Sequence, residues 1–281
     1  MDYKLQSFIV LCETMNYRAA AEQLHLTQPA VTKQIQALER LYNVKLFNYD
    51  GKRLTKTEQG HILEKYAASL RYNYTELQRA LSATRHIKLR IGATKTIGEY
   101  IIGDLIARTL QKPDRNVSLE VDNTHNLLLM LNRNELDFAI VEGLFNKNDY
   151  AHELFKKEGF TGICALDCPL NGRKLKIEEV LSYPLIVREQ GSGTRYILES
   201  ALRQNGYELD AFSRVSEISS FKLIASLCAQ GLGISFVYQS VHDGEHDLGS
   251  FEVEGISGEH EFNIVYLKHT HADSLVKEFF A

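Results

Sequence analysis

The 281-residue sequence has few of the features that mark membrane, secreted or disulfide-stabilised proteins. Its four cysteines are not spaced as a disulfide framework, and a chain of this length needs none, which fits a reducing compartment. No apolar run approaches the roughly 20 residues that span a bilayer. The run Leu5–Cys12 is short, contains polar residues and precedes Glu13, so it predicts an amphipathic helix rather than a secretory signal. We therefore expect a cytoplasmic protein with no membrane partner.

Motifs of enzyme chemistry are also missing. The segment "GSGTR" lacks the spacing of a nucleotide-binding loop, and the sequence has no G-x-S-x-G motif. His242 and His246 stand four residues apart, but their segment contains a glycine, is interpreted as a solvated loop, and has no matching Cys or His elsewhere. Cys164 and Cys168 are also four apart, which leaves a redox switch as an alternative, although Cys164 lies in an apolar, strand-like run. The sequence predicts no enzyme activity, no cofactor and no metal site.

The chain carries little net charge, but its charged residues are unevenly distributed. The net charge of -4 does not indicate a polyanionic partner for the whole chain. Residues 1–90, however, contain 14 Lys+Arg and 8 Asp+Glu, whereas the remainder contains 18 and 28, so the two parts carry +6 and -10. A chain of this length holds more than one domain, and this asymmetry predicts that the N-terminal part meets nucleic acid.

One of the four prolines lies inside a stretch of helical composition, "AAEQLHLTQPAVTKQIQALE". If Thr27 is the N-cap of a helix, Pro29 falls in the first turn, where its missing amide hydrogen is not needed. The helix then covers Gln28 to about Leu41. A shorter helix, Arg18–Leu24, precedes it across a turn of three residues. Two helices on such a turn predict a helix-turn-helix.

The second helix carries side chains suited to the major groove of DNA. Gln28, Thr32 and Gln36 follow one another at four-residue spacing, opposite the apolar Val31 and Ile35. Glutamine can bond bidentately to adenine, threonine can contact a thymine methyl group, and a neighbouring lysine can reach guanine or phosphate. A solvated polar face on a bundle helix is the alternative interpretation.

A basic hairpin is predicted next. Asp50-Gly51 is a strong turn signal between two short strand-like segments. Lys52, Arg53 and Lys56 make this hairpin suitable for contacts with DNA phosphates. Together with the helix-turn-helix, the residues expected at the DNA are Arg18, Thr27, Gln28, Pro29, Ala30, Thr32, Lys33, Gln36, Lys52 and Arg53.

One long helix is predicted from Glu58 to about Arg85. Its apolar residues keep a spacing of nearly 3.5 residues, which is typical of a narrow seam between paired helices and favours dimerisation. The residues expected in this seam are Leu63, Tyr66, Leu70, Leu77 and Leu81. A core helix of a single domain is the alternative.

The rest of the chain alternates strand-like and helix-like segments, which predicts a mainly parallel α/β arrangement. The expected buried strands are Leu89–Ala93, Val117–Val121, Leu136–Val141, Phe160–Leu166, Leu185–Val187, Ile234–Tyr238 and Phe262–Leu267.

An ordered set of motifs resembles those of the LysR-type transcriptional regulators. In the N-terminal part they are Phe8 with its helix, "NYRAAAEQLHLTQPAVTKQIQALE", Leu46-Phe47 and "LTKTEQG". In the body they are "IGATKTIGEYI", "LDFAIVEG", "GSGTR" and "AQGLGISFV", so the resemblance covers nearly the whole chain. The family often has an arginine shortly after the Leu-Phe pair, where this chain has Asn48 and Tyr49. One phosphate contact of the hairpin therefore lacks its usual residue, although Lys52 and Arg53 can replace it.

The resemblance implies an α/β protein overall, with an N-terminal winged helix-turn-helix, a long linker helix and two α/β subdomains similar to a periplasmic binding protein. We expect the DNA-binding domain over residues 1–57, the linker and dimerisation helix over 58–86, and an effector-binding domain over 87–281. Within the last, subdomain I is expected at about 87–161 plus 267–281, and subdomain II at about 162–266.

Two loops are candidates for the effector site. In open α/β sheets, ligands bind beyond the carboxyl ends of strands and at helix N-termini. "GATKTIGEY" follows the first strand and "GSGTR" follows the strand at 185–187, and both offer hydroxyls, amides and a positive charge. Each loop alone is more often a capped turn with a surface ion pair, but the two together, at corresponding strand ends, favour a site for a small anion. The residues expected at the effector are Thr94, Lys95, Thr96, Thr124, Gly191, Ser192, Gly193, Thr194 and Arg195.

The sequence therefore predicts a sequence-specific regulator that binds double-stranded promoter DNA and a small anionic metabolite between two subdomains. The metabolite is expected to be a carboxylate, a sulfate-like ion or a phosphorylated species. The chain is expected to associate with itself as a dimer or tetramer. The alternatives are a solute-binding or sequestering protein without DNA regulation and, on weaker grounds, a redox-sensing regulator.

Overall fold

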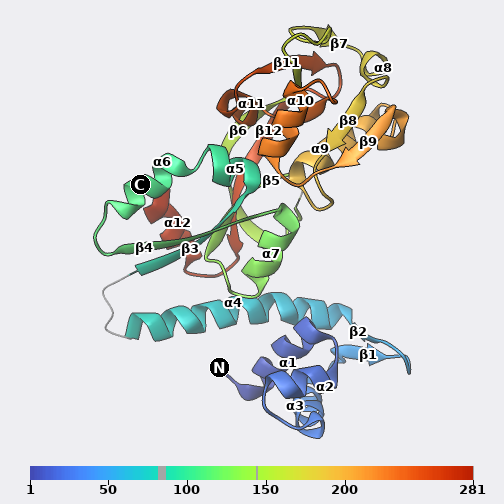
Figure 1. Ribbon diagram of the computed structural model, residues 1–281. Coiled ribbons are helices and arrows are strands. Elements are labelled where there is room, and N and C mark those ends of the chain that lie inside the picture. The colour runs from blue at the N-terminus through green and yellow to red at the C-terminus, as the bar shows by residue number, and fades with distance from the viewer. Residues whose placement is uncertain (82–86, 144, 281) are drawn as a thin grey trace. The chain divides into compact units, whose positions relative to one another are not determined.

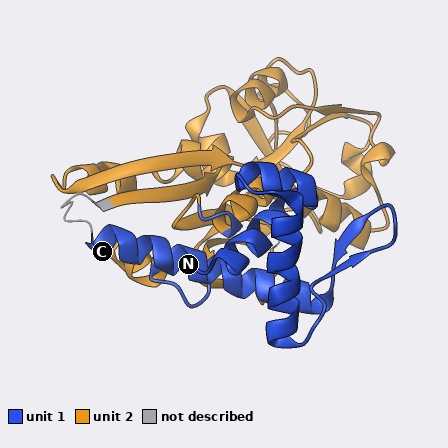
Figure 2. Ribbon diagram, turned by 90° about the horizontal axis from the view of Figure 1, so that it is seen from below, with its two compact units in different colours: residues 1–84, 132–134, 267–271 blue, residues 85–131, 135–266, 272–281 orange. Residues whose placement is uncertain are grey.

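The computed structural model describes residues 1–81, 87–143 and 145–280. The chain divides into two compact units, which Figure 2 shows in different colours. Unit 1 consists of residues 1–84, 132–134 and 267–271, and unit 2 of residues 85–131, 135–266 and 272–281. Within the described ranges, no helix is long and apolar enough to cross a membrane.

Unit 1 begins with three short helices, labelled in Figure 1 as α1 (Tyr3–Thr14), α2 (Tyr17–Gln23) and α3 (Gln28–Tyr42). Each follows a residue whose side chain accepts a hydrogen bond from the first turn, namely Asp2, Asn16 and Thr27. The predicted cap of α3 is confirmed, because Thr27 Oγ1 lies 3.4 Å from the Ala30 amide nitrogen and Pro29 occupies the first turn. Short polar caps in the sequence therefore fix where these helices start.

The apolar sides of the three helices form one core. Val31, Ile35 and Leu38 of α3 are buried, as their spacing predicts. Phe8 of α1 is also fully buried, and its ring centroid lies 5.6 Å from that of Phe47 on the following hairpin. With this side of α3 buried in the core, its opposite side faces outward.

The basic hairpin consists of β1 (Phe47–Tyr49) and β2 (Leu54–Lys56), which pair antiparallel. The predicted turn at Asp50-Gly51 is confirmed. Gly51 has φ +91°, a conformation that favours glycine, and Asp50 Oδ1 accepts hydrogen bonds of 2.9 and 2.7 Å from the backbone amides of Lys52 and Arg53. These two bonds lower the pKa of the Asp50 carboxyl.

The long helix α4 (Glu58–Leu81) follows the hairpin. Its predicted continuation to Arg85 falls on residues 82–86, which lie outside the described residues. Leu63 packs against the N-terminal core rather than standing in an open row. The other four residues of the predicted seam are exposed, namely Tyr66, Leu70, Leu77 and Leu81.

Unit 2 contains one curled, mixed sheet that joins its two halves. The first half contains β3 (Ile87–Thr94), α5 (Lys95–Tyr100), α6 (Gly103–Leu110), β4 (Arg115–Asp122), α7 (Thr124–Asn132), β5 (Phe138–Glu142) and the C-terminal α12 (Ala272–Phe280). Strand β3 pairs in parallel with β4 on one side and with β5 on the other. Their carboxyl ends therefore meet at one edge.

The second half of unit 2 is built on two long strands, β6 (Tyr150–Ala165) and β12 (Gly258–Leu267). Its other elements are β7 (Lys174–Leu175), α8 (Ile177–Val180), β8 (Pro184–Val187), α9 (Gly193–Gln204), the 3-10 helix η1 (Leu209–Ala211), β9 (Arg214–Glu217), α10 (Phe221–Ala229), β10 (Ser235–Tyr238), α11 (Gln239–Gly244) and β11 (Leu248–Val253). The main sheet has the order β4-β3-β5-β12-β6-β11-β7, with β10 also paired to β6. As Figure 1 shows, β6 and β12 extend through both halves.

Two features of unit 2 differ from the sequence-based expectation. The strands are mixed in direction rather than mainly parallel: β3 with β4 and β5, β8 with β9, and β7 with β11 pair in parallel, whereas β12 runs antiparallel to β5, and β10 and β11 run antiparallel to β6. The segment with His242 is not a solvated loop throughout, since residues 239–244 form α11. The glycine that suggested a loop, Gly244, lies against the Tyr100 ring, which leaves no room for a Cβ atom.

Gly60 provides a test of the packing in unit 1. A Cβ atom at this position would lie 2.2 Å from the backbone oxygen of Leu46, so Gly60→Ala must displace backbone. We expect Gly60→Ala to destabilise unit 1 by about 1–3 kcal/mol, measured as faster amide hydrogen exchange in α1–α3. Gly103→Ala is the matched control, because nothing lies within 4 Å of that position. Unchanged protection in Gly60→Ala would contradict this packing.

Candidate nucleic-acid interface and ligand cleft

The outward row of α3 presents hydrogen-bonding side chains. Gln28 and Gln36 are exposed and Thr32 is half-buried. Thr32 Oγ1 donates to the Gln28 carbonyl oxygen at 3.0 Å and accepts from Gln28 Nε2 at 3.1 Å. These bonds hold the first two side chains in register along the helix. The row is therefore ordered and faces away from the core, as readout of base edges requires.

The other residues predicted at DNA lie on the same unit. Thr27, Pro29 and Lys33 are exposed around the first turns of α3, and Ala30 is half-buried there. Arg18 is exposed on α2, where its Nε lies 3.2 Å from a Glu22 carboxylate oxygen. An exposed ion pair of this kind holds a side chain weakly, so the arginine can exchange partners.

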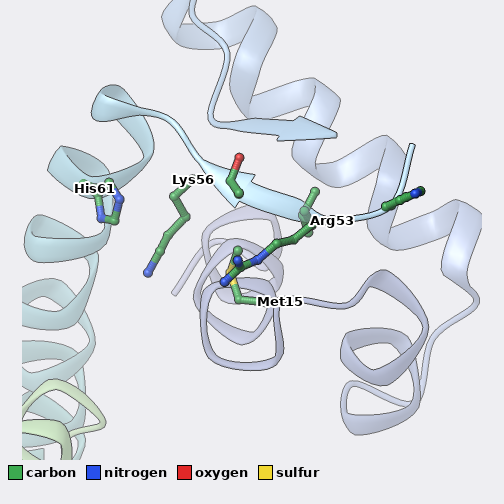
Figure 3. A pocket seen from close by; sticks show the side chains of 7 residues that line it. Met15, Arg53, Lys56 and His61 are labelled. Carbon is green, nitrogen blue, oxygen red and sulfur yellow. The ribbon is translucent and has the colours of Figure 1, made fainter. Parts of the chain in front are cut away.

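The hairpin adds a basic hollow of about 410 Å³ beside the three helices (Figure 3). Figure 3 shows the Arg53 side chain extending toward Met15. Lys56 Nζ donates to both Glu64 carboxylate oxygens at 2.8 and 2.7 Å, so its charge is matched within the protein. Lys52 and Arg53 form no ion pair among the described residues. Their charges are available to phosphate groups.

In unit 2, Glu142 occupies the point where several loops at strand ends converge. It is the last residue of β5 and is 2% exposed. Its carbonyl oxygen accepts a 2.7 Å hydrogen bond from Thr124 Oγ1, and its carboxylate oxygen Oε1 accepts a 2.9 Å bond from Thr194 Oγ1. Thr124 begins α7 in one half of the unit, and Thr194 lies in the first turn of α9 in the other. One residue thus contacts both halves.

Two glycines allow this convergence. A Cβ atom on Gly193 would lie 2.6 Å from the Glu142 carbonyl oxygen. A Cβ atom on Gly143, which has φ +80°, would lie 2.7 Å from the Gly193 Cα atom. The backbone of residues 142 and 143 is in direct contact with that of Gly193, and any larger residue at either glycine would push α9 away from β5.

Several buried polar atoms around this point have no hydrogen-bond partner in the described part of the chain. They are Thr94 Oγ1, Thr96 Oγ1, Glu142 Oε2, Arg188 Nη1, Ser192 Oγ and Tyr238 Oη. Thr94 and Ser192 occupy the N-cap positions of α5 and α9, yet neither side chain makes the capping bond. Helix capping therefore does not account for these two hydroxyls. Unpaired buried polar groups are costly, so a site that retains several of them is suited to a polar ligand.

The charged residues predicted for this site have partners within the protein. Lys95 Nζ donates to the Ser219 carbonyl oxygen at 2.7 Å and lies 3.8 Å from a Glu189 carboxylate oxygen. Arg195 contacts the carboxylates of Glu199 and Glu217 at 2.7 and 2.5 Å. The structure therefore places both cations at the site with their charge already compensated.

Arg188, which was not predicted from the sequence, is buried more deeply than Lys95 and Arg195. It is 3% exposed, donates to both Glu189 carboxylate oxygens at 2.8 and 2.9 Å, and stacks over the Phe221 ring at 4.2 Å. Its remaining terminal nitrogen is one of the unpartnered atoms. Arg188 directly follows β8 and Glu142 ends β5, so the rule that ligands bind beyond strand ends could have selected both.

The predicted effector residues fall into two adjoining groups. One group lines a hollow of about 410 Å³ between the starts of α7 and α9, and it contains Thr124, Gly191, Ser192, Gly193 and Arg195. Thr94, Lys95 and Thr96 are not among the residues that line that hollow. Thr96 is instead fully buried beside the Glu142 carboxyl, and its Oγ1 atom has no hydrogen-bond partner among the described residues. Glu142 therefore connects the two groups.

The two cysteines considered for a redox switch lie near the end of β6. Cys164 is 1% exposed, and burial, with the neighbouring Cys168, raises the pKa of its thiol to about 12. The reactive thiolate of Cys164 is therefore strongly disfavoured at neutral pH.

Comparison with known proteins agrees with this two-part geometry. Residues 3–61 match the family of bacterial regulatory helix-turn-helix proteins of the lysR type, and residues 83–281 match the LysR substrate binding domain. The HTH-type transcriptional regulator CysL of Bacillus subtilis (strain 168) is 32% identical over 243 residues, which cover 84% of this chain and 80% of CysL.

Two solved structures show a similar fold. A full-length OxyR variant from Pseudomonas aeruginosa is 22% identical, covers 98% of this chain and 92% of its own, and has a TM-score of 0.64. The CcmR regulatory domain of Synechocystis PCC6803, in complex with 2-PG, is 24% identical, covers 68% of this chain and 95% of its own, and has a TM-score of 0.62. Because both family models match and CysL is 32% identical, the chain belongs to the LysR family of transcriptional regulators.

Proposed function

We propose that this LysR-type regulator reads promoter DNA with α3 and the basic hairpin, and responds to a small anion held around Glu142. The exposed row on α3 is the observation that carries the proposal, since Gln28 and Gln36 present amides to solvent. A solute-binding protein would have no use for that row or for the unpaired charges of Lys52 and Arg53.

The DNA-binding role divides between two kinds of contact. Side chains at 28, 32, 33 and 36 are suited to base edges, because the start of a recognition helix projects deepest into the major groove. Arg18, Lys52 and Arg53 are suited to phosphates, which fix position without reading sequence. Thr27, Pro29 and Ala30 shape the first turn that brings these groups to the duplex.

The effector role rests on the donors of the cleft. The unpartnered hydroxyls of Thr94 and Ser192 and the unpartnered nitrogen of Arg188 all offer hydrogens to a negatively charged group. The complex of the CcmR regulatory domain with 2-PG supports a ligand site in this type of domain. A ligand that binds one arrangement of the two halves better than another shifts the population toward it, and this shift is the basis of regulation.

Self-association and domain limits complete the proposal. The exposed stripe of Tyr66, Leu70, Leu77 and Leu81 on α4 is suited to pairing with a second copy of the chain, as a dimer and, through further contacts, a tetramer. Residues 1–57, 58–86 and 87–281 are the proposed DNA-binding, linker and effector domains. The four free cysteines and a promoter DNA partner are consistent with action in the cytoplasm.

Substitutions on α3 and on the hairpin distinguish base readout from phosphate contact. Gln28→Ala is expected to cost about 1–3 kcal/mol at one base pair and to relax specificity there. Arg53→Ala is expected to weaken binding to operator and random DNA alike. Fluorescence anisotropy over a salt series, with an operator selected from random oligonucleotides, measures both effects. Equal losses on operator and random DNA for Gln28→Ala would exclude base readout by this residue.

Removal of the Thr94 and Ser192 hydroxyls, which occupy N-cap positions but make no capping bond, tests the effector site. Ser192→Ala and Thr94→Val are each expected to weaken binding of sulfate or acetate about tenfold, the loss of one charge-assisted hydrogen bond, and to leave DNA binding by the ligand-free protein unchanged. Titration calorimetry measures the first effect and anisotropy the second. Ser118→Ala on the exposed side of β4 is the control. Normal anion binding by both cleft variants would show that the site lies elsewhere.

A charge placed in the α4 stripe tests self-association. Leu77→Asp is expected to shift the chain toward monomer in sedimentation velocity, because an aspartate cannot be buried in an apolar seam without a partner. Gln78→Asp adds the same charge at the adjacent exposed position and should leave the distribution unchanged. A Leu77→Asp protein that sediments like the parent would refute the seam.

A further inference from the structure

A buried carboxylate lies directly behind the hollow at the starts of α7 and α9, because Gly193, which lines that hollow, packs against Glu142. A site for a simple anion would be expected to have only donors there. Glu142 is 2% exposed, and its Oε2 atom has no hydrogen-bond partner, whereas its Oε1 atom accepts from Thr194 Oγ1 at 2.9 Å. The unpartnered donors Thr94 and Ser192 belong to the loops that pack beside it. An anion bound to those donors would meet the negative charge of Glu142 at short range.

The nearby charges are already balanced without a ligand. Arg188 faces Glu142 from the end of β8, but both Glu189 carboxylate oxygens accept hydrogen bonds from it. Lys95, on α5, lies 3.8 Å from Glu189. The two cations are thus matched by the two acids, Glu142 and Glu189. Adding an anion leaves a net negative charge in a buried site, which is strongly unfavourable.

Among the described residues, the remaining groups around Glu142 offer no further positive charge. Tyr238, from β10, is fully buried beside it, and burial together with Glu142 and Glu158 raises the pKa of its phenol, so it stays neutral. Thr96 from α5 and Thr194 from α9 are neutral hydroxyls. Burial raises the pKa of the Glu142 carboxyl, and the hydrogen bond from Thr194, the nearby Thr96 hydroxyl and the charge of Arg188 only partly oppose it.

We propose that the cleft takes up its anion together with one proton, which binds to Glu142 Oε2 and turns that atom from an acceptor into a donor toward the ligand. The proton comes from solvent, one O–H bond forms, and for a monoanion the charge of the occupied site equals that of the empty one. Glu142 is then the residue that makes ligand affinity depend on pH. This inference rests on the proposed anion site and adds its proton coupling.

Titration calorimetry on the full chain tests the proton directly. Acetate and formate are suitable probes, because both are monoanions whose charge does not change near neutral pH. Repeating each titration in two buffers of different ionisation enthalpy counts the protons taken up. We expect close to one proton per anion above the pKa of Glu142, and an affinity that falls about tenfold for each further pH unit. Binding without proton uptake and without pH dependence overturns the proposal. This test uses the wild-type protein alone.

Glu142→Gln supplies the matched comparison. Its amide donates without titrating, so anion binding is expected to be pH-independent, without proton uptake, and at least about tenfold tighter than wild type at about pH 8. Glu120→Gln, which removes an exposed acid on β4, should behave as wild type. Proton uptake that persists in Glu142→Gln assigns the proton to another group and overturns the proposal. Failure of both anions to bind to any form at low pH contradicts the anion site itself, and the proton coupling with it.

Thermal unfolding of the ligand-free proteins checks the same group independently. A carboxyl whose pKa is raised on folding contributes stability at low pH that is lost as pH rises through the folded pKa. Glu142→Gln is therefore expected to melt above wild type at about pH 8 and close to it at about pH 5. A difference that does not change with pH would show that the buried charge has no cost, which also overturns the proposal.

Discussion

The contact between the Glu142 carboxylate and the Thr194 hydroxyl, supported by backbone packing of Gly143 on Gly193, is the constraint on which the ligand site depends. It sets the end of β5 against the first turn of α9, although the two segments belong to different halves of unit 2. Through the Thr124 bond to the same residue, α7 is fixed as well. The loops that carry the unpartnered hydroxyls are therefore held at one point.

The site is rich in hydrogen-bond donors but is not simply electropositive. Arg188 and Arg195 form ion pairs with neighbouring glutamates, and Lys95 lies beside Glu189. What remains for a ligand is a set of directional hydrogen bonds around one buried acid. In such a site, binding depends on which groups hold protons, because a charge cannot be added without compensation at this depth. A regulator built this way couples ligand recognition to protonation.

Features specified by neighbouring residues were predicted correctly from the sequence. Thr27 with Pro29 marks the start of α3, and Asp50-Gly51 closes the hairpin, because caps and turns depend on a few adjacent side chains. The first part of β6, residues 150–159, was not predicted, since its burial is mixed and it contains no apolar run. The mixed direction of the sheet was also missed, because pairing between distant strands leaves no local pattern.

The sequence alone determined the family, the helix-turn-helix, the exposed row on α3 and the loops that bear hydroxyls. These follow from periodicity, capping and ordered motifs, which act over a few residues. Only the tertiary structure decided which charges remain for a ligand. It paired Arg195 with two acids, buried Arg188 against Phe221, and placed Glu142 among the donors. Charge compensation and burial depend on residues that are far apart in the chain, so their outcome is set by folding.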